Sequence, residues 1–157
     1  MKILFVCLGN ICRSPLAAGI MKKKLRKRKL LAEIDSAGFE DFHLDDRADP
    51  RSVQIATKHG IDITDHRARL FTVEDFDRFD RIYVMDLGNY SDVIQLARTE
   101  ADRNKVVLIL DTIYPGQYRE VPDPYYRGKE GFEKVYHLLD LACGKIADQL
   151  KKGQAKN

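Results

Sequence analysis

The sequence contains no tryptophan and only three cysteines, Cys7, Cys12 and Cys143. Three cysteines, a small and uneven number, do not supply the disulfide framework of a secreted domain. We therefore expect free thiols and predict a cytoplasmic location. No apolar run reaches the roughly 18 residues of a membrane-spanning helix, so none is expected. The first residues, MKILFVCLGN, turn polar too soon to form a secretory signal.

Sequence motifs for nucleotides and metals are also missing. Neither GxxxxGK[ST] nor GxGxxG occurs, so a nucleotide-binding loop of either type is not supported. The cysteines and the four scattered histidines offer no obvious set of zinc ligands, and we expect neither a metal nor a cofactor. The formal charge of +3, from 27 Lys and Arg against 24 Asp and Glu, is too small to imply a nucleic-acid partner.

What is present predicts one α/β domain spanning residues 1–157, of which 44% are hydrophobic. Strands are expected at 2–6, 32–36, 81–85 and 106–110, and helices at about 15–30, 50–59, 74–78, 88–99 and 132–150. Strands that alternate with helices indicate a parallel sheet with helices on both faces. Ligands of such sheets bind beyond the carboxyl ends of the strands.

The stretch VCLGNICRSP, at residues 6–15, occupies that position after the first strand. Ser14 followed by Pro15 is a good start for a helix, with Ser14 as its N-cap. Residues 7–13 then form a loop that leads to a helix N-terminus. Free backbone N–H groups and the helix dipole favour a bound anion there, so we predict a site for phosphate or another oxyanion.

The residue types in this loop match phosphoryl chemistry. Gly9 permits a tight turn, and Asn10 tolerates left-handed backbone and can hold the turn with its side chain. Arg13 offers a planar fork for two phosphate oxygens. Cys7 lies at the mouth of the loop, where the positive field favours a thiolate, and a thiolate that faces a phosphate is a nucleophile aimed at phosphorus.

Cleavage of a phosphate ester also needs a proton donor for the leaving oxygen. Asp123 in VPDPYYRG is the best candidate, because prolines on both sides fix its backbone. Asp-Pro is also common in ordinary turns, so that alternative stays open. Tyr125 and Tyr126, which follow, are either surface aromatics or an apolar wall for an aromatic substrate ring.

The loop VCLGNICRSP and the later DPYY together resemble the low-molecular-weight protein tyrosine phosphatases, and the resemblance covers almost the whole chain. It implies a four-stranded parallel sheet with helices on both sides, a Rossmann-like phosphatase fold. It also implies that Cys7 forms a cysteinyl-phosphate, that Arg13 and the loop amides bind the phosphate, and that Asp123 is the general acid and base. No metal is needed in that mechanism, and the substrates are phosphotyrosine-containing proteins.

The same resemblance assigns supporting residues. Ser14 hydrogen-bonds the Cys7 sulfur, and Asn10 keeps the loop in shape with help from a serine and a histidine. Further positions implied are Ser36, His66 and Asp86 beside the loop, Cys12 within it, and Leu8, Ile11, Phe42, Tyr125 and Tyr126 around the substrate ring. Phe42 stands where vertebrate members carry a tryptophan, a departure that concerns specificity at the rim.

Cys12 has two open interpretations. It shares one loop with Cys7, so the two thiols could form a disulfide under oxidation and protect the nucleophile from irreversible damage. It could equally be a packing residue, since free cysteine is commonly buried.

Three alternative functions fit parts of the sequence. Arsenate reductases share the loop but need further cysteines in a relay, and none occurs between Cys12 and Cys143. Arginine phosphatases on the same fold carry threonine where Ile11 stands and lack the paired tyrosines. A phosphate-binding adaptor without activity is disfavoured, because a nucleophile, a clamp and an acid are all present.

The run KKKLRKRK, residues 22–29, is strongly basic. It could serve a binding module for nucleic acid or acidic lipid, or form a basic rim that attracts acidic phosphopeptides. With so low a net charge, we favour a solvated helix face with Leu25 turned inward, and expect no nucleic-acid partner. The chain is predicted to be a monomer or a weak homodimer.

Overall fold

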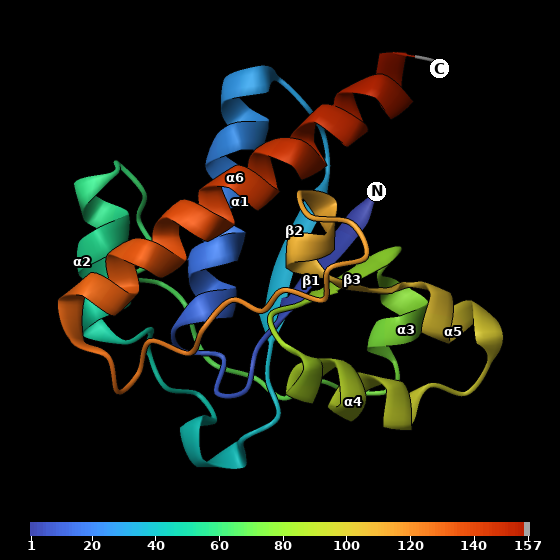
Figure 1. Cartoon of the computed structure of the whole chain (residues 1–157), viewed down its shortest axis with the longest axis horizontal. Helices are drawn as coiled ribbons and strands as arrows, with labels where there is room; N and C mark the ends of the chain where they lie inside the picture. The colour runs from blue at the N-terminus through green and yellow to red at the C-terminus, as the bar shows by residue number, and fades with distance from the viewer. Residues whose placement is uncertain (156–157) are drawn as a thin grey trace.

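The computed structural model describes residues 1–155, and its centre is a parallel sheet of four strands in the order β2-β1-β3-β4 (Figure 1). The strands are β1 Lys2–Val6, β2 Glu33–Ala37, β3 Arg81–Val84 and β4 Val106–Leu108. The predicted four-stranded parallel sheet is therefore confirmed.

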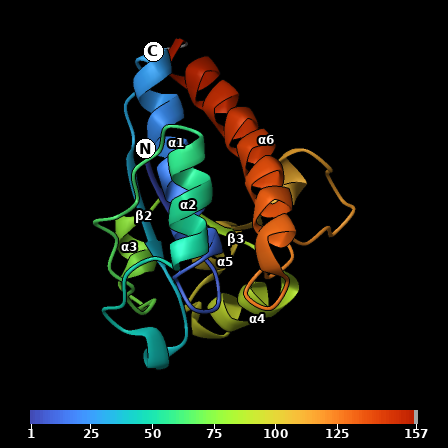
Figure 2. The same cartoon turned by 90° about the vertical axis from the view of Figure 1, so that its left-hand side faces the viewer.

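Helices cover both faces of this sheet. The α-helices are α1 Arg13–Arg28, α2 Pro50–Lys58, α3 Asp75–Arg78, α4 Leu87–Leu96, α5 Glu100–Asn104 and α6 Gly128–Ala155. Side chains alternate along each strand, so Ile3 and Phe5 enter one core with α1, α2 and α6. Leu4 and Val6 face the other core, which includes Phe76 of α3. Figure 2 shows α1, α2 and α6 side by side on their face.

The sequence predicted the positions of most elements but not all of their ends. The chain does not remain extended through 106–110. It leaves the sheet after Leu108 and forms the 3-10 helix η2, Ile109–Thr112, where the Thr112 hydroxyl donates to the Ile109 carbonyl at 2.7 Å. The predicted helix at 88–99 ends at Leu96, and α5 was missed. A second 3-10 helix, η1, spans Asp41–His43.

The register places the carboxyl ends of the strands at one edge. Val6 at the end of β1 pairs with Ala37 of β2 and Val84 of β3, and Val84 pairs with Leu108 of β4. The loop that follows β1 therefore lies beside the segments that follow the other strands (Figure 1). Within residues 1–155, no helix is long and apolar enough to cross a membrane.

Candidate active site

The loop between β1 and α1 folds back on itself at the strand ends. Asn10 has a left-handed backbone with φ 55°, as its side-chain type allows. The Leu8 carbonyl accepts from the Phe39 and Glu40 N–H groups at 2.8 and 3.1 Å. Gly38 makes this approach possible, because a Cβ there would lie 2.8 Å from the Leu8 oxygen and 2.9 Å from the Asn10 nitrogen.

The Asn10 side chain ties the loop to the rest of the fold. Its Nδ2 donates to the Ser14 hydroxyl at 2.8 Å and to the Ser36 hydroxyl at 3.0 Å. Its Oδ1 accepts the Arg69 backbone N–H at 2.9 Å. His66 Nε2 lies 2.6 Å from the Asn10 carbonyl and serves as a donor to it. Burial lowers the pKa of His66, so the ring is neutral at pH 7. The structure thus brings Ser36 and His66 to the loop.

The Cys7 sulfur lies 3.0 Å from the Ser14 hydroxyl and 3.5 Å from the Ser14 backbone nitrogen. The prediction that Ser14 is the N-cap of α1 was wrong. The helix begins at Arg13 and Cys12 is its N-cap, without a side-chain hydrogen bond. Ser14 instead lies inside the first turn, where its hydroxyl is engaged by Cys7 and Asn10.

The Arg13 guanidinium is buried, with 2% of its side chain exposed, and has fixed partners. Its Nη1 donates to Asp86 Oδ2 at 2.8 Å and to the Val121 carbonyl at 2.9 Å. Burial alone would lower the pKa of Arg13, but the Cys7 sulfur and the Asp86 carboxylate outweigh burial and its pKa is raised. Nη2 faces Asp123 Oδ2 at 3.6 Å.

Asp86 serves two purposes. Its Oδ1 accepts the Asn89 backbone N–H at 2.8 Å as the N-cap of α4, while Oδ2 binds Arg13. Asp86 therefore lies beside the loop, as the resemblance implied, and also caps a helix.

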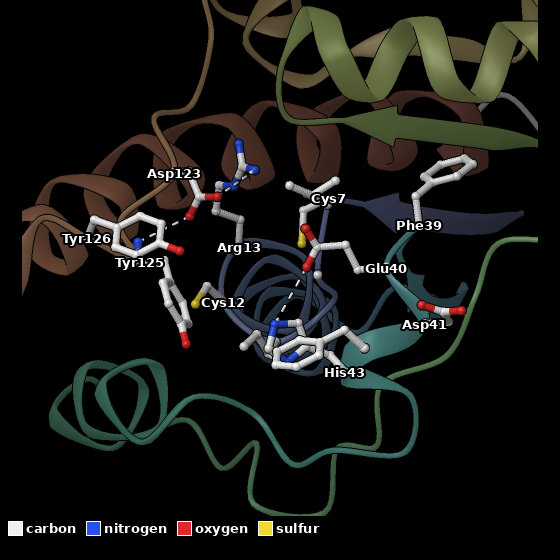
Figure 3. Close-up of a pocket in the computed structure, with 14 residues that line it drawn as sticks. Cys7, Cys12, Arg13, Phe39, Glu40, Asp41, His43, Asp123, Tyr125 and Tyr126 are labelled. Atoms are coloured by element: carbon white, nitrogen blue, oxygen red, sulfur yellow. Dashed lines mark hydrogen bonds and ion pairs between the residues drawn. The ribbon is translucent and has the colours of Figure 1, made fainter.

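Cys7, Arg13 and Asp123 converge on one cleft of about 570 Å³ (Figure 3). Asp123 is 43% exposed, and its Oδ1 accepts the Tyr125 backbone N–H at 3.1 Å in a short turn. The turn interpretation of this aspartate is therefore compatible with a place in the cleft. The full lining is Cys7, Leu8, Gly9, Ile11, Cys12, Arg13, Phe39, Glu40, Asp41, Phe42, His43, Asp123, Tyr125 and Tyr126.

A sequence model of the family described as low molecular weight phosphotyrosine protein phosphatase matches residues 2–156. The chain belongs to this family. A relative of that name from Schizosaccharomyces pombe is 40% identical over 145 residues, which are 90% of this chain and 92% of the relative.

Solved structures agree with the family. A protein tyrosine phosphatase from Entamoeba histolytica, with Hepes in its active site, superposes with a TM-score of 0.90 at 37% identity, covering 98% of this chain and 99% of that chain. The Drosophila arginine phosphatase DARP superposes with a TM-score of 0.89 at 32% identity, covering 96% of this chain and 98% of the other. The fold is therefore shared by phosphatases named for two different phosphorylated side chains.

The aromatic residues of this phosphatase line its cleft unequally. Tyr126 and Phe42 are 92% and 81% exposed, so they form the outer rim, whereas Ile11 is buried at 7%.

Sequence reasoning missed the side of the cleft formed by Glu40 and His43, whose Oε2 and Nε2 atoms are 3.6 Å apart. Only their proximity to Phe42 in the chain could have indicated them.

Arg51 holds Tyr125 in place through contacts that the sequence did not reveal. Arg51 Nη1 donates to the Tyr125 carbonyl at 2.9 Å, and its guanidinium lies 5.3 Å from the Tyr125 ring centre. Asp49 binds Arg51 through both carboxylate oxygens and caps α2. This wall of the cleft is therefore anchored to α2.

Cys12 packs in a small cluster with Ile11, Ala68 and Phe132. Burial, followed by the nearby Asp49 carboxylate, raises the pKa of Cys12, so its thiol is protonated at neutral pH. Cys7 and Cys12 are both free thiols in this structure. A protective disulfide between them stays a prediction.

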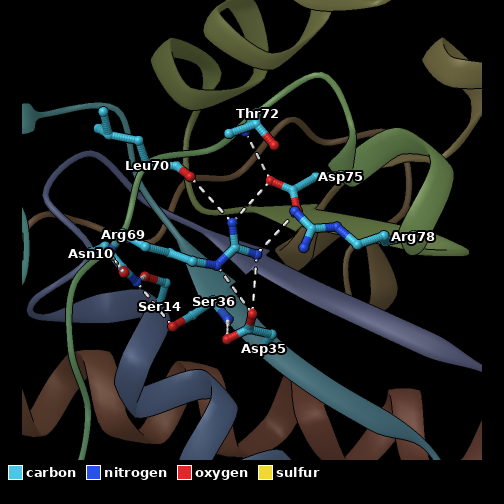
Figure 4. A network of polar contacts seen from close by, with 9 residues as sticks. All are labelled: Asn10, Ser14, Asp35, Ser36, Arg69, Leu70, Thr72, Asp75 and Arg78. Carbon is cyan, nitrogen blue, oxygen red and sulfur yellow. Dashed lines mark hydrogen bonds and ion pairs between the residues drawn. The ribbon is translucent and has the colours of Figure 1, made fainter.

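A further polar network supports the loop from the side of β2 (Figure 4). Arg69 donates to both carboxylate oxygens of the fully buried Asp75 at 3.0 and 3.1 Å and to Asp35 at 3.1 Å. Asp75 also accepts from the Thr72 backbone N–H and from Arg78. The Arg69 backbone N–H, held in place by this network, reaches Asn10. No motif in the sequence marks these residues.

Proposed function

We propose that the chain hydrolyses phosphotyrosine in proteins through a cysteinyl-phosphate, with Cys7 as nucleophile, Arg13 as phosphate clamp and Asp123 as general acid and base. The observation that carries this proposal is their convergence on one cleft, where Asp123 lies 3.6 Å from the buried guanidinium of Arg13. Membership of the phosphotyrosine phosphatase family supports the same reaction.

In the first step the Cys7 thiolate attacks phosphorus and the bond to the phenol oxygen breaks. Asp123 protonates that oxygen, so tyrosine leaves as the neutral phenol. The loop N–H groups and the Arg13 fork stabilise the charge on the equatorial phosphoryl oxygens. Because Nη1 is fixed by Asp86 and Val121, the guanidinium is already oriented before substrate arrives.

In the second step water attacks the phosphorus of the intermediate, and Asp123, now a carboxylate, removes its proton. The sulfur leaves as a thiolate, and inorganic phosphate is released. The Ser14 hydroxyl, 3.0 Å from the sulfur, donates to this thiolate and helps it leave. Asn10, Ser36 and His66 hold the loop in the shape that both steps need. No metal or cofactor takes part in this scheme.

Two features support tyrosine over arginine as the phosphorylated side chain. Ile11 and Tyr125 give the cleft an apolar wall, and Arg51 holds Tyr125 at that wall. An aromatic ring gains from such a wall, whereas the guanidinium of phosphoarginine would rely on carboxylates such as Glu40 elsewhere in the lining. The match to an arginine phosphatase keeps that activity as the second candidate.

The chain lacks the relay of further cysteines that arsenate reduction needs. The third cysteine, Cys143, has no exposed surface and lies in α6, where its thiol donates to the Ala17 carbonyl at 3.7 Å. It does not line the cleft, so Cys7 and Cys12 have no third cysteine there to complete a relay.

Hydrolysis of 4-nitrophenyl phosphate without added metal tests the proposal, with the Cys7→Ser and Asp123→Ala variants for comparison. We expect no turnover by the first variant and a loss of ~10²–10⁴-fold by the second, the usual contribution of a positioned acid. Paired peptides that carry phosphotyrosine or phosphoarginine at one position then separate the two candidates. Full activity of Cys7→Ser, or a preference for phosphoarginine, would contradict the proposal.

We further propose that the protein acts in the cytoplasm as a monomer or weak homodimer. The three free thiols support a reducing location. Sedimentation of the purified protein measures its oligomeric state.

A further inference from the structure

We propose that a second hollow beside the cleft binds acidic side chains that flank the phosphotyrosine in protein substrates. This flank hollow, of about 570 Å³, lies between the segment 119–123, α6 and the end of β3. Its charged lining includes Arg119, Arg127 and Lys134. The inference rests on the proposed function, because it concerns the same substrates.

The flank hollow and the cleft share a wall. Asp123 lines both of them. Asp86 and Val121, which also line the flank hollow, are the two residues that hold Nη1 of Arg13. A phosphotyrosine in the cleft would therefore place neighbouring residues of its peptide at this wall, since an extended chain advances by about 3.3 Å per residue.

The cations of the flank hollow are not neutralised by the protein. Within residues 1–155, no carboxylate lies within ion-pair distance of Arg119, Arg127 or Lys134. Arg119 is positioned by uncharged groups, with its guanidinium 4.0 Å from the ring centre of Tyr114 and its Nε donating to Gln117 at 2.9 Å. Arg127 and Lys134 flank the N-terminal turn of the long helix α6, whose dipole adds positive potential.

The carboxylates that line the same hollow are already engaged. Asp86 is bound by Arg13 and by a backbone N–H of α4, and Glu120 accepts the Leu87 backbone N–H at 2.8 Å. Asp123 faces Arg13 and carries a proton when it serves as the acid. With Asp86 paired to Arg13 and Asp123 protonated, Glu120 is the one carboxylate of the lining whose charge stands against the three cations, and a glutamate or aspartate side chain is the complementary occupant.

The groove on the other side of Tyr125 does not offer an excess of positive charge. Its lining holds one arginine, Arg47, whose Nη1 donates to the Thr64 carbonyl at 3.4 Å, against the two carboxylates of Asp46 and Asp49. Selection for acidic flanks is therefore expected to come from the side of Asp123.

The test compares kcat/KM for three phosphotyrosine peptides of equal length, one with neutral flanks, one with glutamates before the phosphotyrosine and one with glutamates after it. For the intact protein at low salt, we expect at least one acidic peptide to exceed the neutral one by about fivefold or more. In R127Q/K134Q this ratio should fall below about twofold, while turnover of 4-nitrophenyl phosphate stays within about twofold. The variant K151Q/K152Q removes the same charge from the exposed far end of α6 and should keep the ratio.

The inference is wrong if the intact protein shows no acidic preference, if R127Q/K134Q retains it, or if K151Q/K152Q loses it equally. Failure of the proposed function looks different, because 4-nitrophenyl phosphate and all three peptides would then remain intact. In that case fluorescence anisotropy with the same labelled peptides decides the matter. Tighter binding of an acidic peptide that R127Q/K134Q abolishes supports the flank hollow, and equal binding of all three overturns it.

Discussion

The Cys7 sulfur receives two contacts from one residue, the hydroxyl and the backbone N–H of Ser14. Replacing Ser14 with alanine removes the hydroxyl that stabilises the departing thiolate. We expect kcat to fall by about 10- to 100-fold, with a burst of phenol equal to the enzyme concentration, because breakdown of the intermediate becomes rate-limiting. Stopped-flow absorbance with 4-nitrophenyl phosphate measures both. Equal loss of kcat and kcat/KM without a burst would contradict this role.

His66 makes stability depend on pH. Its folded pKa is lowered by burial, so as pH falls below about 6.5 the unfolded chain takes up a proton before the native ring does. Stability is therefore lost on going from pH 7.5 to 5.5. Asp35 and Asp65 oppose this shift, and Lys22 adds to it. His66→Gln cannot titrate and retains an N–H donor for the Asn10 carbonyl.

Urea unfolding at several pH values checks this prediction. The free energy of unfolding of His66→Gln should decline less between pH 7.5 and 5.5 than that of the intact protein. Parallel declines would show that His66 is not the titrating group.

At the scale of single residues, the sequence indicates the groups whose chemistry is local. Cys7 and Arg13 belong to one loop, and the prolines around Asp123 mark a fixed carboxylate. Ser36 and His66 are 26 and 56 residues from Asn10 in the chain. Only a family resemblance can connect them before the fold is known, because a lone serine or histidine carries no signal of its partner.

Between elements, the loop is held by the segment that precedes α3. Arg69 and Arg78 bind the same buried carboxylate of Asp75, but only Arg69 also donates its backbone N–H to Asn10. Arg69→Gln leaves a buried carboxylate short of a partner and loosens that segment. We expect a loss of ~2–4 kcal/mol of stability and a fall in kcat/KM of about tenfold.

Arg78→Gln is the matched control. Its side chain is 58% exposed, so the stability change should stay below ~1 kcal/mol and kcat/KM should hardly change. Urea unfolding and steady-state kinetics separate the two variants. Similar effects of Arg69→Gln and Arg78→Gln would contradict a role of Arg69 in positioning the loop. The same conclusion would follow if a third variant, Arg69→Lys, had full kcat/KM but remained as unstable as Arg69→Gln.

The elements themselves are predictable where apolar residues recur with a clear period. The final helix has such a period: Leu138 on its apolar face is half-buried, and the rest of that face is buried, namely Phe132, Val135, Leu139, Ala142, Ile146 and Leu150. Residues 106–110 are uniformly apolar, so the pattern does not reveal that the strand ends at Leu108. Helix α5 has too few apolar residues for any periodicity, and its start depends on the side-chain cap of Thr99. Such ends depend on tertiary contacts and on caps.

Across the whole molecule, the basic run 22–29 forms the carboxyl half of α1 and its C-cap, Lys29, whereas the cleft is at the amino end of the helix. Leu25 is buried as predicted. Lys27 is about 20 Å along the helix from Arg13, well beyond a screening length of about 8 Å at physiological salt. We therefore expect R26Q/K27Q to change kcat/KM by less than about twofold for both peptides and aryl phosphate. A loss confined to peptides would instead assign the run to substrate attraction.

In the proposed reaction, the phosphoryl group passes through a covalent bond to the sulfur of Cys7. Rapid acid quench during turnover of 4-nitrophenyl phosphate, followed by peptide mass spectrometry, measures that bond directly. We expect a phosphoryl adduct on Cys7 in the intact protein and in Cys12→Ser, and none in Cys7→Ser. An adduct on another residue, or hydrolysis by Cys7→Ser at the normal rate, would contradict it.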